Sequence, residues 1–226
     1  MENMKRIALI HAVPAAMQPI EDAFKARWPE AKRTNLLDDS LAADREKAGR
    51  LTSQMSERII SLARYAVSSG ADAVLFTCSA FGEAIEVAAI TLPVPVLKPN
   101  EAMFDAALKI GGRIGMLATF APAVASMEEE FSEMAGQRGS AASLETLYVR
   151  GAREALMAGE LEKHDSLIAA AASGLAHCNA IMLAHFSMAT ADQQTRHNAT
   201  CAVLTAPDSA VVRLRSTLAW TNATQV

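Results

Sequence analysis

Several features that would assign this sequence to a function class are missing from it. Its 226 residues contain three cysteines, Cys78, Cys178 and Cys201, and none forms a CxxC pair or a zinc-finger spacing. An odd number of dispersed cysteines indicates reduced thiols, so we expect no disulfide framework and a cytoplasmic location. No segment approaches the roughly 20 consecutive apolar residues of a membrane-spanning helix. We therefore expect no membrane insertion.

The sequence also lacks an excess of charge of one sign. The formal net charge is −4, and no stripe of Lys and Arg follows a helical period, which argues against a nucleic-acid partner. No glycine-rich phosphate loop is present, because Gly111-Gly112 precedes a predicted strand instead of joining a strand to a helix. We expect no nucleotide cofactor, and the partners should be a small molecule and copies of the same chain.

The amino-terminal stretch has a superficial likeness to a secretory leader. Its apolar run, Ile7–Ile10, is short and is followed directly by His11. Leader peptides carry a longer apolar region than this. We interpret the stretch as a first β-strand.

What the sequence does contain is a regular alternation of short apolar runs and longer helical patterns. The clearest helical pattern covers Arg45–Ser69, with apolar residues every three or four positions and Gly70 where a helix would end. Strands that alternate with helices form parallel sheets covered by helices. The strand candidates are Arg6–His11, Ala73–Thr77, Val94–Leu97, Arg113–Thr119, Ala180–Ala184 and Ala202–Thr205.

Three of these strands recur at a constant distance along the chain. Any two α/β units share a general pattern, but chance similarity does not preserve the spacing between three separate blocks. We interpret the spacing as an internal duplication. The blocks that lie 107 positions apart are Arg6–Ile10 with Arg113–Leu117, Ala71–Phe76 with Cys178–Leu183, and Val94–Leu97 with Cys201–Leu204.

The duplication predicts an α/β fold of two pseudo-symmetric, Rossmann-like lobes, each a parallel sheet flanked by helices. We expect residues 1–98 plus 207–226 to form the first lobe and residues 99–206 the second. The spacing drifts once, where Lys32–Leu37 should correspond to Leu144–Val149. Ligands of open parallel sheets bind beyond the carboxyl ends of the strands, so the active site should lie in the cleft between the lobes.

The same spacing relates two residues that carry protons. Cys78 follows the strand Ala73–Thr77, and His185 lies 107 positions later, after the strand Ala180–Ala184. Under a pseudo-two-fold axis these side chains would face each other across one substrate. Removal of a proton from one face of a carbanion and its return on the other require such a pair.

The neighbours of Cys78 suit this chemistry. A thiol at a strand-to-helix turn lies near the positive end of a helix dipole, which favours the thiolate. Thr77 and Ser79 could bind the oxygens of a carboxylate or an enediolate, and Thr119 adds a hydroxyl from the second lobe. His11 ends the first strand of the first lobe and should reach the same place.

These residues resemble a known family, the aspartate/glutamate/hydantoin racemase superfamily, over about Arg6 to Leu214. Ile114–Thr119 (IGMLAT) is similar to the Gly-x-Leu-Ala-Thr block of the family, and Thr77-Cys78-Ser79 to its first catalytic cysteine motif. The superfamily includes maleate isomerases and arylmalonate decarboxylases, and the segment Ile7–Ala15 is similar to the amino-terminal segment of these two branches. The resemblance implies that Cys78 is the catalytic thiol, that Thr77, Ser79 and Thr119 bind substrate oxygens, and that no cofactor is used.

The sequence departs from the family at the second catalytic position. Family racemases carry a second cysteine there, whereas this chain reads Ala184–Met188 (AHFSM) with His185 in the place of the cysteine. A thiol and an imidazole could still interconvert enantiomers. Alternatively a single thiol suffices for a decarboxylase, or for a cis–trans isomerase in which a thiolate adds to a double bond. A non-catalytic small-acid binding protein is a third reading.

We therefore expect a cofactor-independent racemase or isomerase acting on the carbon α to a carboxylate or carbonyl. Its catalytic residues would be Cys78 and His185. Substrate binding would involve His11, Thr77, Ser79, Thr119, Phe186 and Ser187. We expect no metal, because His11, Cys78 and His185 have no carboxylate partner or ligand spacing, and we expect a homo-oligomer.

The remaining candidate residues have structural interpretations. Cys178 and Cys201 should be small buried residues at strand starts, and His164, His177 and His197 should lie on the surface. Asp38 and Asp39 follow a predicted strand and could orient a substrate amine or simply begin a helix.

Overall fold

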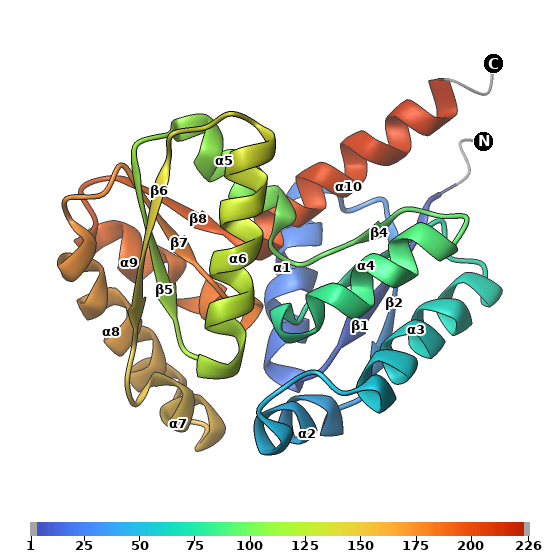
Figure 1. The fold of residues 1–226 in the computed structure, drawn as a ribbon, viewed down its shortest axis with the longest axis horizontal. Coiled ribbons are helices and arrows are strands. Elements are labelled where there is room, and N and C mark those ends of the chain that lie inside the picture. Colours follow the sequence, from blue (N-terminus) through green and yellow to red (C-terminus); the bar gives the residue numbers. More distant parts are fainter. Residues whose placement is uncertain (1–3, 224–226) are drawn as a thin grey trace. The chain divides into compact units, whose positions relative to one another are not determined.

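A computed structural model of the chain describes residues 4–223. It is an α/β protein with two four-stranded parallel sheets, each flanked by helices (Figure 1). The chain divides into two compact units. Residues up to Glu101 and from Ala210 onwards form the first, and Ala102–Ser209 form the second. The boundaries between the units fall after Glu101 and after Ser209, whereas the repeat predicts them after residues 98 and 206.

The first unit is built on a sheet with the strand order β2-β1-β3-β4. Its helices connect successive parallel strands, as βαβ crossovers require. Its elements are β1 (Arg6–His11), η1 (Pro14–Ala16), α1 (Met17–Arg27), β2 (Lys32–Leu37), α2 (Ser40–Ala48), α3 (Ser53–Ser68), β3 (Ala73–Phe76), η2 (Ser79–Phe81), α4 (Gly82–Thr91), β4 (Val96–Leu97) and most of α10 (Ala206–Ala223).

The second unit repeats this plan with the order β6-β5-β7-β8. The short 3-10 helices after β3 and β7 occupy equivalent places in the two units. The elements are α5 (Glu101–Ile110, with Glu101 counted in the first unit), β5 (Arg113–Ala118), α6 (Ala121–Gln137), β6 (Ser143–Tyr148), α7 (Ala152–Met157), α8 (Leu161–Ala171), η3 (Ala172–Leu175), β7 (Ala180–Leu183), η4 (Phe186–Ala191), α9 (Asp192–Asn198) and β8 (Ala202–Thr205).

The two sheets share their strand register. Ile7 pairs with Ala73 in the first sheet, and Ile114 pairs with Ala180 in the second, each residue 107 positions after its counterpart. The outer pairs β3–β4 and β7–β8 also keep this spacing, since Val74 lies opposite Val96 and Ile181 opposite Val203. A one-residue slip would turn every side chain to the other face of the sheet. The shared register therefore gives both units the same pattern of buried side chains.

The expected match of Lys32–Leu37 with Leu144–Val149 is wrong by one residue. Arg6 lies opposite Lys32, and its equivalent Arg113 lies opposite Ser143, so Lys32 corresponds to Ser143. Both edge strands then begin with an exposed residue followed by a half-buried one. The alternation of exposed and half-buried residues along a strand aligns β2 with β6 more accurately than the similarity of their residues does.

The single helix expected over Arg45–Ser69 is two helices. Gly49 adopts φ +67° and ends α2, and its backbone N–H is bonded to the carbonyl oxygen of Arg45 at 3.1 Å. The hydroxyl of Thr52 then caps α3 by accepting the N–H of Met55 at 3.3 Å. A glycine after a helix and a threonine before one are common helix-boundary residues. The apolar residues continue at helical spacing across this boundary, so their period alone predicts one helix.

The predicted end of this pattern at Gly70 is confirmed. Gly70 adopts φ +85° just beyond α3, a conformation that costs little only for glycine. Its N–H bonds to the carbonyl of Val67 at 2.9 Å, and the N–H of Ala71 bonds to that of Ala66 at 3.2 Å. This pair of bonds is a Schellman motif, which satisfies carbonyls that the helix leaves open.

The strand expected over Val94–Leu97 is shorter, because β4 covers Val96–Leu97 alone. Pro93 and Pro95 have no N–H to donate to a neighbouring strand. The carbonyl of Pro95 still accepts the N–H of Val74 at 2.9 Å. The chain is thus aligned with β3 before the strand proper begins.

The core of each unit lies around its two central strands. All residues of β3 and of β7 are buried, and β1 and β5 are buried after their first residue. Such continuous burial is typical of parallel sheets covered on both faces. Within residues 4–223, no helix combines the length and apolar content needed to cross a membrane. The homo-oligomer remains a prediction.

Replacement of Gly115 by alanine should destabilise the second unit. A Cβ atom at Gly115 would lie 2.8 Å from Cδ1 and 3.1 Å from Cβ of Leu175, whose side chain is fully buried. Overpacking of this kind costs about 1–3 kcal/mol. Urea unfolding followed by circular dichroism measures the loss. Gly136→Ala is the control, because that site in α6 is open and alanine favours the helix. Equal unfolding midpoints for the two variants would contradict the expectation.

Candidate functional site

Cys78 lies at the carboxyl end of β3. The N–H of Thr77 bonds to the carbonyl of Ile10 at 3.0 Å, which extends the β1–β3 ladder one residue beyond the strand. Cys78 itself is extended (φ −126°, ψ 123°), and the single turn η2 and helix α4 begin directly after it. Its side chain is half-buried, and its sulfur forms no disulfide. Cys78 therefore has the position at a strand-to-helix turn that the sequence predicts.

His185 has the same backbone setting in the second unit. The N–H of Ala184 bonds to the carbonyl of Leu117 at 3.0 Å, and these residues lie 107 positions after Thr77 and Ile10. His185 is extended (φ −114°, ψ 148°), and η4 begins at the next residue. Each unit thus ends its second central strand with a half-buried side chain able to carry a proton.

His11 supports Thr77 from within the first unit. His11 is fully buried, and its Nε2 lies 2.8 Å from Oδ1 of Asn35, to which it donates in the neutral ring. Its Nδ1 lies 2.9 Å from Oγ1 of Thr77 and therefore accepts a hydrogen bond from the Thr77 hydroxyl. Burial lowers the pKa of His11, against the opposing effects of the Asn35 hydrogen bond and the charge of Glu21. Both ring nitrogens are engaged within the first unit, and direct contact between His11 and substrate stays a prediction.

Arg45 on α2 is a polar residue beside Cys78 that the sequence reading overlooked. Its side chain is buried, and its Nε donates to the carbonyl of Ala80 at 3.3 Å. The negative charges of Glu83 and of the Cys78 thiolate oppose the lowering of the Arg45 pKa that burial causes. Nη1 of Arg45 is buried with no hydrogen-bond partner among the described residues. A guanidinium in this place stabilises a thiolate and retains capacity for a ligand oxygen.

Asn100 is a second buried polar residue near the carboxyl end of the first sheet. It follows β4 by three residues and is 1% exposed. Both its amide nitrogen and its amide oxygen lack a hydrogen-bond partner within the described part of the chain. Buried amides without partners are costly and uncommon. Asn100 is therefore a candidate for contact with a polar ligand.

Asp38 fixes the position of α2. Its carboxylate accepts hydrogen bonds from Nε of Arg58 at 3.1 Å and from Oγ of Ser40 at 2.8 Å. Arg58 also binds Asp44 on α2 at 2.6 Å. Burial alone would raise the pKa of Asp38, but the bonds from Arg58 and Ser40 outweigh it and lower the pKa. Asp38 thus ties α2, which carries Arg45, to α3.

The ring of Phe120 contacts both His185 and Arg153. Its Nε2 accepts the backbone N–H of Phe120 at 3.1 Å, so in the neutral ring the proton resides on Nδ1. The guanidinium of Arg153 lies 4.5 Å from the centroid of the Phe120 ring. Burial and the charge of Arg153 together lower the pKa of His185 to about 4. His185 is consequently a neutral imidazole at pH 7.

The other predicted residues, which adjoin Cys78 or His185 in the chain or follow β5, differ in burial. Thr119 follows β5 and is 3% exposed, and Phe186 is fully buried beside His185. Ser79 and Ser187 are half-buried at the starts of η2 and η4. Phe186 contributes to the core of the second unit, and contact of Phe186, Ser79 and Ser187 with substrate stays a prediction.

Comparisons with known proteins agree with this architecture. The crystal structure of glutamate racemase RacE1 from Bacillus anthracis matches with a TM-score of 0.75 at 11% identity, covering 96% of this chain and 82% of that one. Allantoin racemase from Pseudomonas fluorescens gives 0.68 at 19% identity, over 96% and 92%. Aspartate racemase from Picrophilus torridus gives 0.70 at 13% identity, over 90% and 89%. No curated protein sequence matches the chain.

The fold and the paired strand-to-helix turns define an α/β protein of duplicated parallel-sheet units. The family model for Asp/Glu/hydantoin racemases matches residues 10–214, which is nearly the whole chain. The chain belongs to the Asp/Glu/hydantoin racemase family. The resemblance noted in Ile114–Thr119 and Thr77-Cys78-Ser79 is thereby confirmed at the level of the family.

Replacement of Arg153 by methionine should raise the pKa of His185 from about 4 towards the ordinary value of 6.5. The substitution removes a cation that disfavours the imidazolium, while burial keeps part of the depression. Titration of the imidazole resonances by NMR measures the change. Arg150→Met is the control, because Arg150 is an exposed arginine in the same segment. An unchanged pKa in Arg153→Met would show that burial alone lowers it.

The same pKa predicts how stability depends on pH. His185 has a lower pKa in the folded protein than in the unfolded chain, so the unfolded chain binds more protons between pH 6.5 and about 4. The free energy of unfolding should therefore decrease as the pH falls through this range. The decrease should be smaller in Arg153→Met than in the unmodified protein.

Proposed function

We propose that this protein is a cofactor-independent racemase that moves a proton at the carbon α to a carboxylate or carbonyl. The substrate would be a small amino acid, a hydantoin or a related acid. The observation that carries the proposal is the equivalence of Cys78 and His185, which end strands of the same register with the same extended backbone. Membership of a racemase family, with glutamate, aspartate and allantoin racemases among the similar structures, supports an isomerase.

In this mechanism the Cys78 thiolate removes the α-proton and becomes a thiol. The carbanion places its charge on the substrate oxygens, and a protonated His185 delivers a proton to the opposite face of the carbon. The product state, thiol with neutral imidazole, is the starting state for the other enantiomer. Protons and charges therefore balance over one cycle in either direction.

The polar groups around Cys78 would stabilise the negative charge that develops in this reaction. The hydroxyl of Thr77 donates its only proton to the fully buried His11, so Thr77 is fixed in place but does not itself donate to a substrate oxygen. Arg45 has a buried Nη1 free of hydrogen bonds to the described residues, which suits an enediolate or carboxylate oxygen. Fixed donors are effective because they need no reorganisation as the charge appears.

To act as the acid, His185 must take up a proton at Nε2, which requires the hydrogen bond from the Phe120 N–H to be broken. Its pKa of about 4 leaves it neutral at pH 7, and Arg153 is part of the reason. A carboxylate bound near Arg153 would offset that positive charge and raise the pKa of His185. We propose that an anionic substrate thereby prepares its own proton donor.

The low pKa of His185 also supports a second candidate function. A neutral imidazole donates a hydrogen bond from Nδ1 without transferring a proton. Cys78 would then be the single proton carrier of a decarboxylase, or the nucleophile of a cis–trans isomerase acting on a dicarboxylate. In both reactions His185 would only bind a substrate oxygen.

Substitution of Cys78 by alanine should abolish racemisation, and with it solvent exchange of the α-proton in the enantiomer that Cys78 deprotonates. A panel of α-substituted acids and hydantoins incubated in D2O and followed by proton NMR detects deuterium on the α-carbon. Loss of an acid–base group lowers such rates by about 10²–10⁴-fold. Cys201→Ala is the control, because Cys201 precedes β8 at the opposite end of a sheet. Label uptake by both enantiomers of a substrate in Cys78→Ala would refute the mechanism, because His185 alone can exchange the proton of only one of them. Ligand binding without any turnover would favour a binding protein.

Substitution of His185 by glutamine separates the two enzymes. A racemase needs His185 to carry a proton, so glutamine should reduce racemisation by about 10²–10⁴-fold. A decarboxylase or cis–trans isomerase that uses Cys78 alone should retain most of its rate, because glutamine still donates a hydrogen bond. Chiral chromatography and product NMR distinguish the outcomes.

A further inference from the structure

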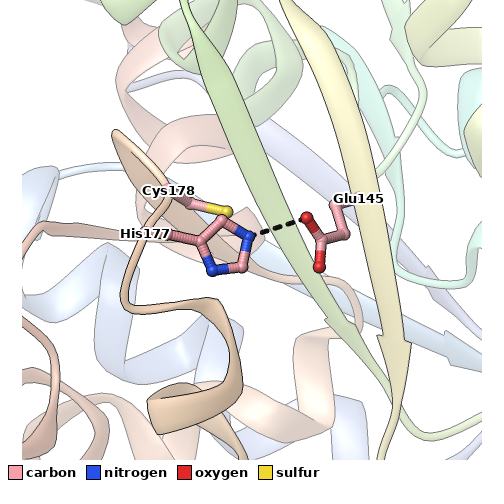
Figure 2. Close-up of side chains that lie close together, drawn as sticks. All are labelled: Glu145, His177 and Cys178. Carbon is pink, nitrogen blue, oxygen red and sulfur yellow. Dashed lines mark hydrogen bonds and ion pairs between the residues drawn. The ribbon is translucent and has the colours of Figure 1, made fainter.

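A cluster of three different metal-ligating side chains lies in the second unit. Glu145 comes from β6, and His177 and Cys178 come from the segment that precedes β7 (Figure 2). Nε2 of His177 lies 2.8 Å from Oε2 of Glu145. These two atoms and Sγ of Cys178 all lie within 4.8 Å of one another. The cluster thus offers one nitrogen, one oxygen and one sulfur ligand to a common point.

The segment that carries His177 and Cys178 is held firmly by its backbone. The N–H of Cys178 bonds to the carbonyl of Leu175 at 2.9 Å, and that of Asn179 to the carbonyl of Arg113 at 2.7 Å. The side-chain oxygen of Asn179 accepts the N–H of Arg113 at 2.8 Å. Two of the three ligands are therefore supplied by a segment whose position is fixed without a metal.

Gly115 on β5 provides the room for this arrangement. Strand β5 lies between β6, which carries Glu145, and β7. Glu145 is directly opposite Gly115, and Leu175 covers Gly115 so closely that any side chain there would collide with it. The absence of a side chain lets the chain before β7 approach the sheet, which brings Cys178 within reach of Glu145.

We propose that Glu145, His177 and Cys178 bind a divalent metal ion of the Zn²⁺ class, with water as the fourth ligand. Thiolate, imidazole and carboxylate are the three ligand types that Zn²⁺ takes in proteins. Zn–S bonds of about 2.3 Å and Zn–N and Zn–O bonds of about 2.1 Å place tetrahedral ligands about 3.5 Å apart. The present spacing requires movements of about 1 Å, which the exposed side chains of His177 and Glu145 allow.

The net charge at the site agrees with a cation. A carboxylate and a thiolate together neutralise a divalent ion. Burial and the charge of Glu145 raise the pKa of the Cys178 thiol, so the ion would displace its proton on binding, and the positive charge of Arg113 opposes the cation. In the absence of metal, the His177–Glu145 hydrogen bond is an ordinary exposed contact worth little to stability. A bound ion would replace it and connect the edge strand β6 to the start of β7.

The proposed site is separate from the candidate catalytic residues of its own unit. His177 and Cys178 precede β7, whereas His185 follows it, so the two lie at opposite ends of the strand. The proposal therefore does not depend on the racemase mechanism. Its consequence is structural: a metal that binds the folded unit alone raises its stability in proportion to the logarithm of the metal concentration.

Cobalt substitution tests the site directly. The protein is stripped with a chelator and titrated with Co²⁺, and the expected result is one equivalent with a thiolate-to-cobalt absorption band. Competition by Zn²⁺ should remove the band. His177→Gln and Glu145→Gln should each weaken binding at least 10-fold, since loss of a ligand costs this much or more. Both side chains are exposed, so these variants should fold normally.

Cysteine variants identify the sulfur ligand. Cys178→Ser should abolish the cobalt band, whereas Cys201→Ser and Cys78→Ser should retain it at full intensity. A band that disappears in Cys78→Ser or Cys201→Ser would overturn the proposal. So would a titration that is unchanged in both His177→Gln and Glu145→Gln, because it would leave only the ordinary hydrogen bond. Melting temperature should increase with Zn²⁺ in the unmodified protein and stay constant in His177→Gln.

Discussion

The hydrogen-bond ladder between the two central strands of each sheet is the constraint on which the remaining structure depends. In both units this ladder continues one residue beyond the strand, through the N–H of Thr77 in the first and of Ala184 in the second. The chain must then leave the sheet at the next residue, and a 3-10 turn begins there. Cys78 and His185 are therefore presented by the backbone in the same conformation, whatever their side chains.

Around these two positions the units differ in chemistry. Near Cys78 the protein places a buried arginine, Arg45, and a threonine oriented by a buried histidine. Near His185, burial and then the charge of Arg153 lower the pKa of the imidazole and keep it neutral. Cations favour a thiolate and disfavour an imidazolium. The duplicated backbone thus presents a thiol near a cation in the first unit and a neutral imidazole in the second.

Parts of this arrangement could be predicted because they depend on local pattern. The period of apolar residues located the strands, and the 107-residue spacing predicted that equivalent strands share one register, as β1 with β3 and β5 with β7 do. Predictions failed where several interactions compete over one segment. Gly49 interrupts a continuous helical period, and His164, expected at the surface, is fully buried with its Nδ1 2.7 Å from a carboxylate oxygen of Asp165.

The sequence by itself determined the α/β class, the duplication, the family resemblance and the equivalence of Cys78 with His185, because these follow from periodicity and spacing along one chain. Only the tertiary structure decided that Arg45 lies beside Cys78, that Arg153 lowers the pKa of His185, and that Glu145 meets His177 and Cys178. These contacts join residues about 30 positions or more apart. Burial and electrostatic coupling arise from distances in space, and a separation in sequence carries no record of them until the sheets have formed.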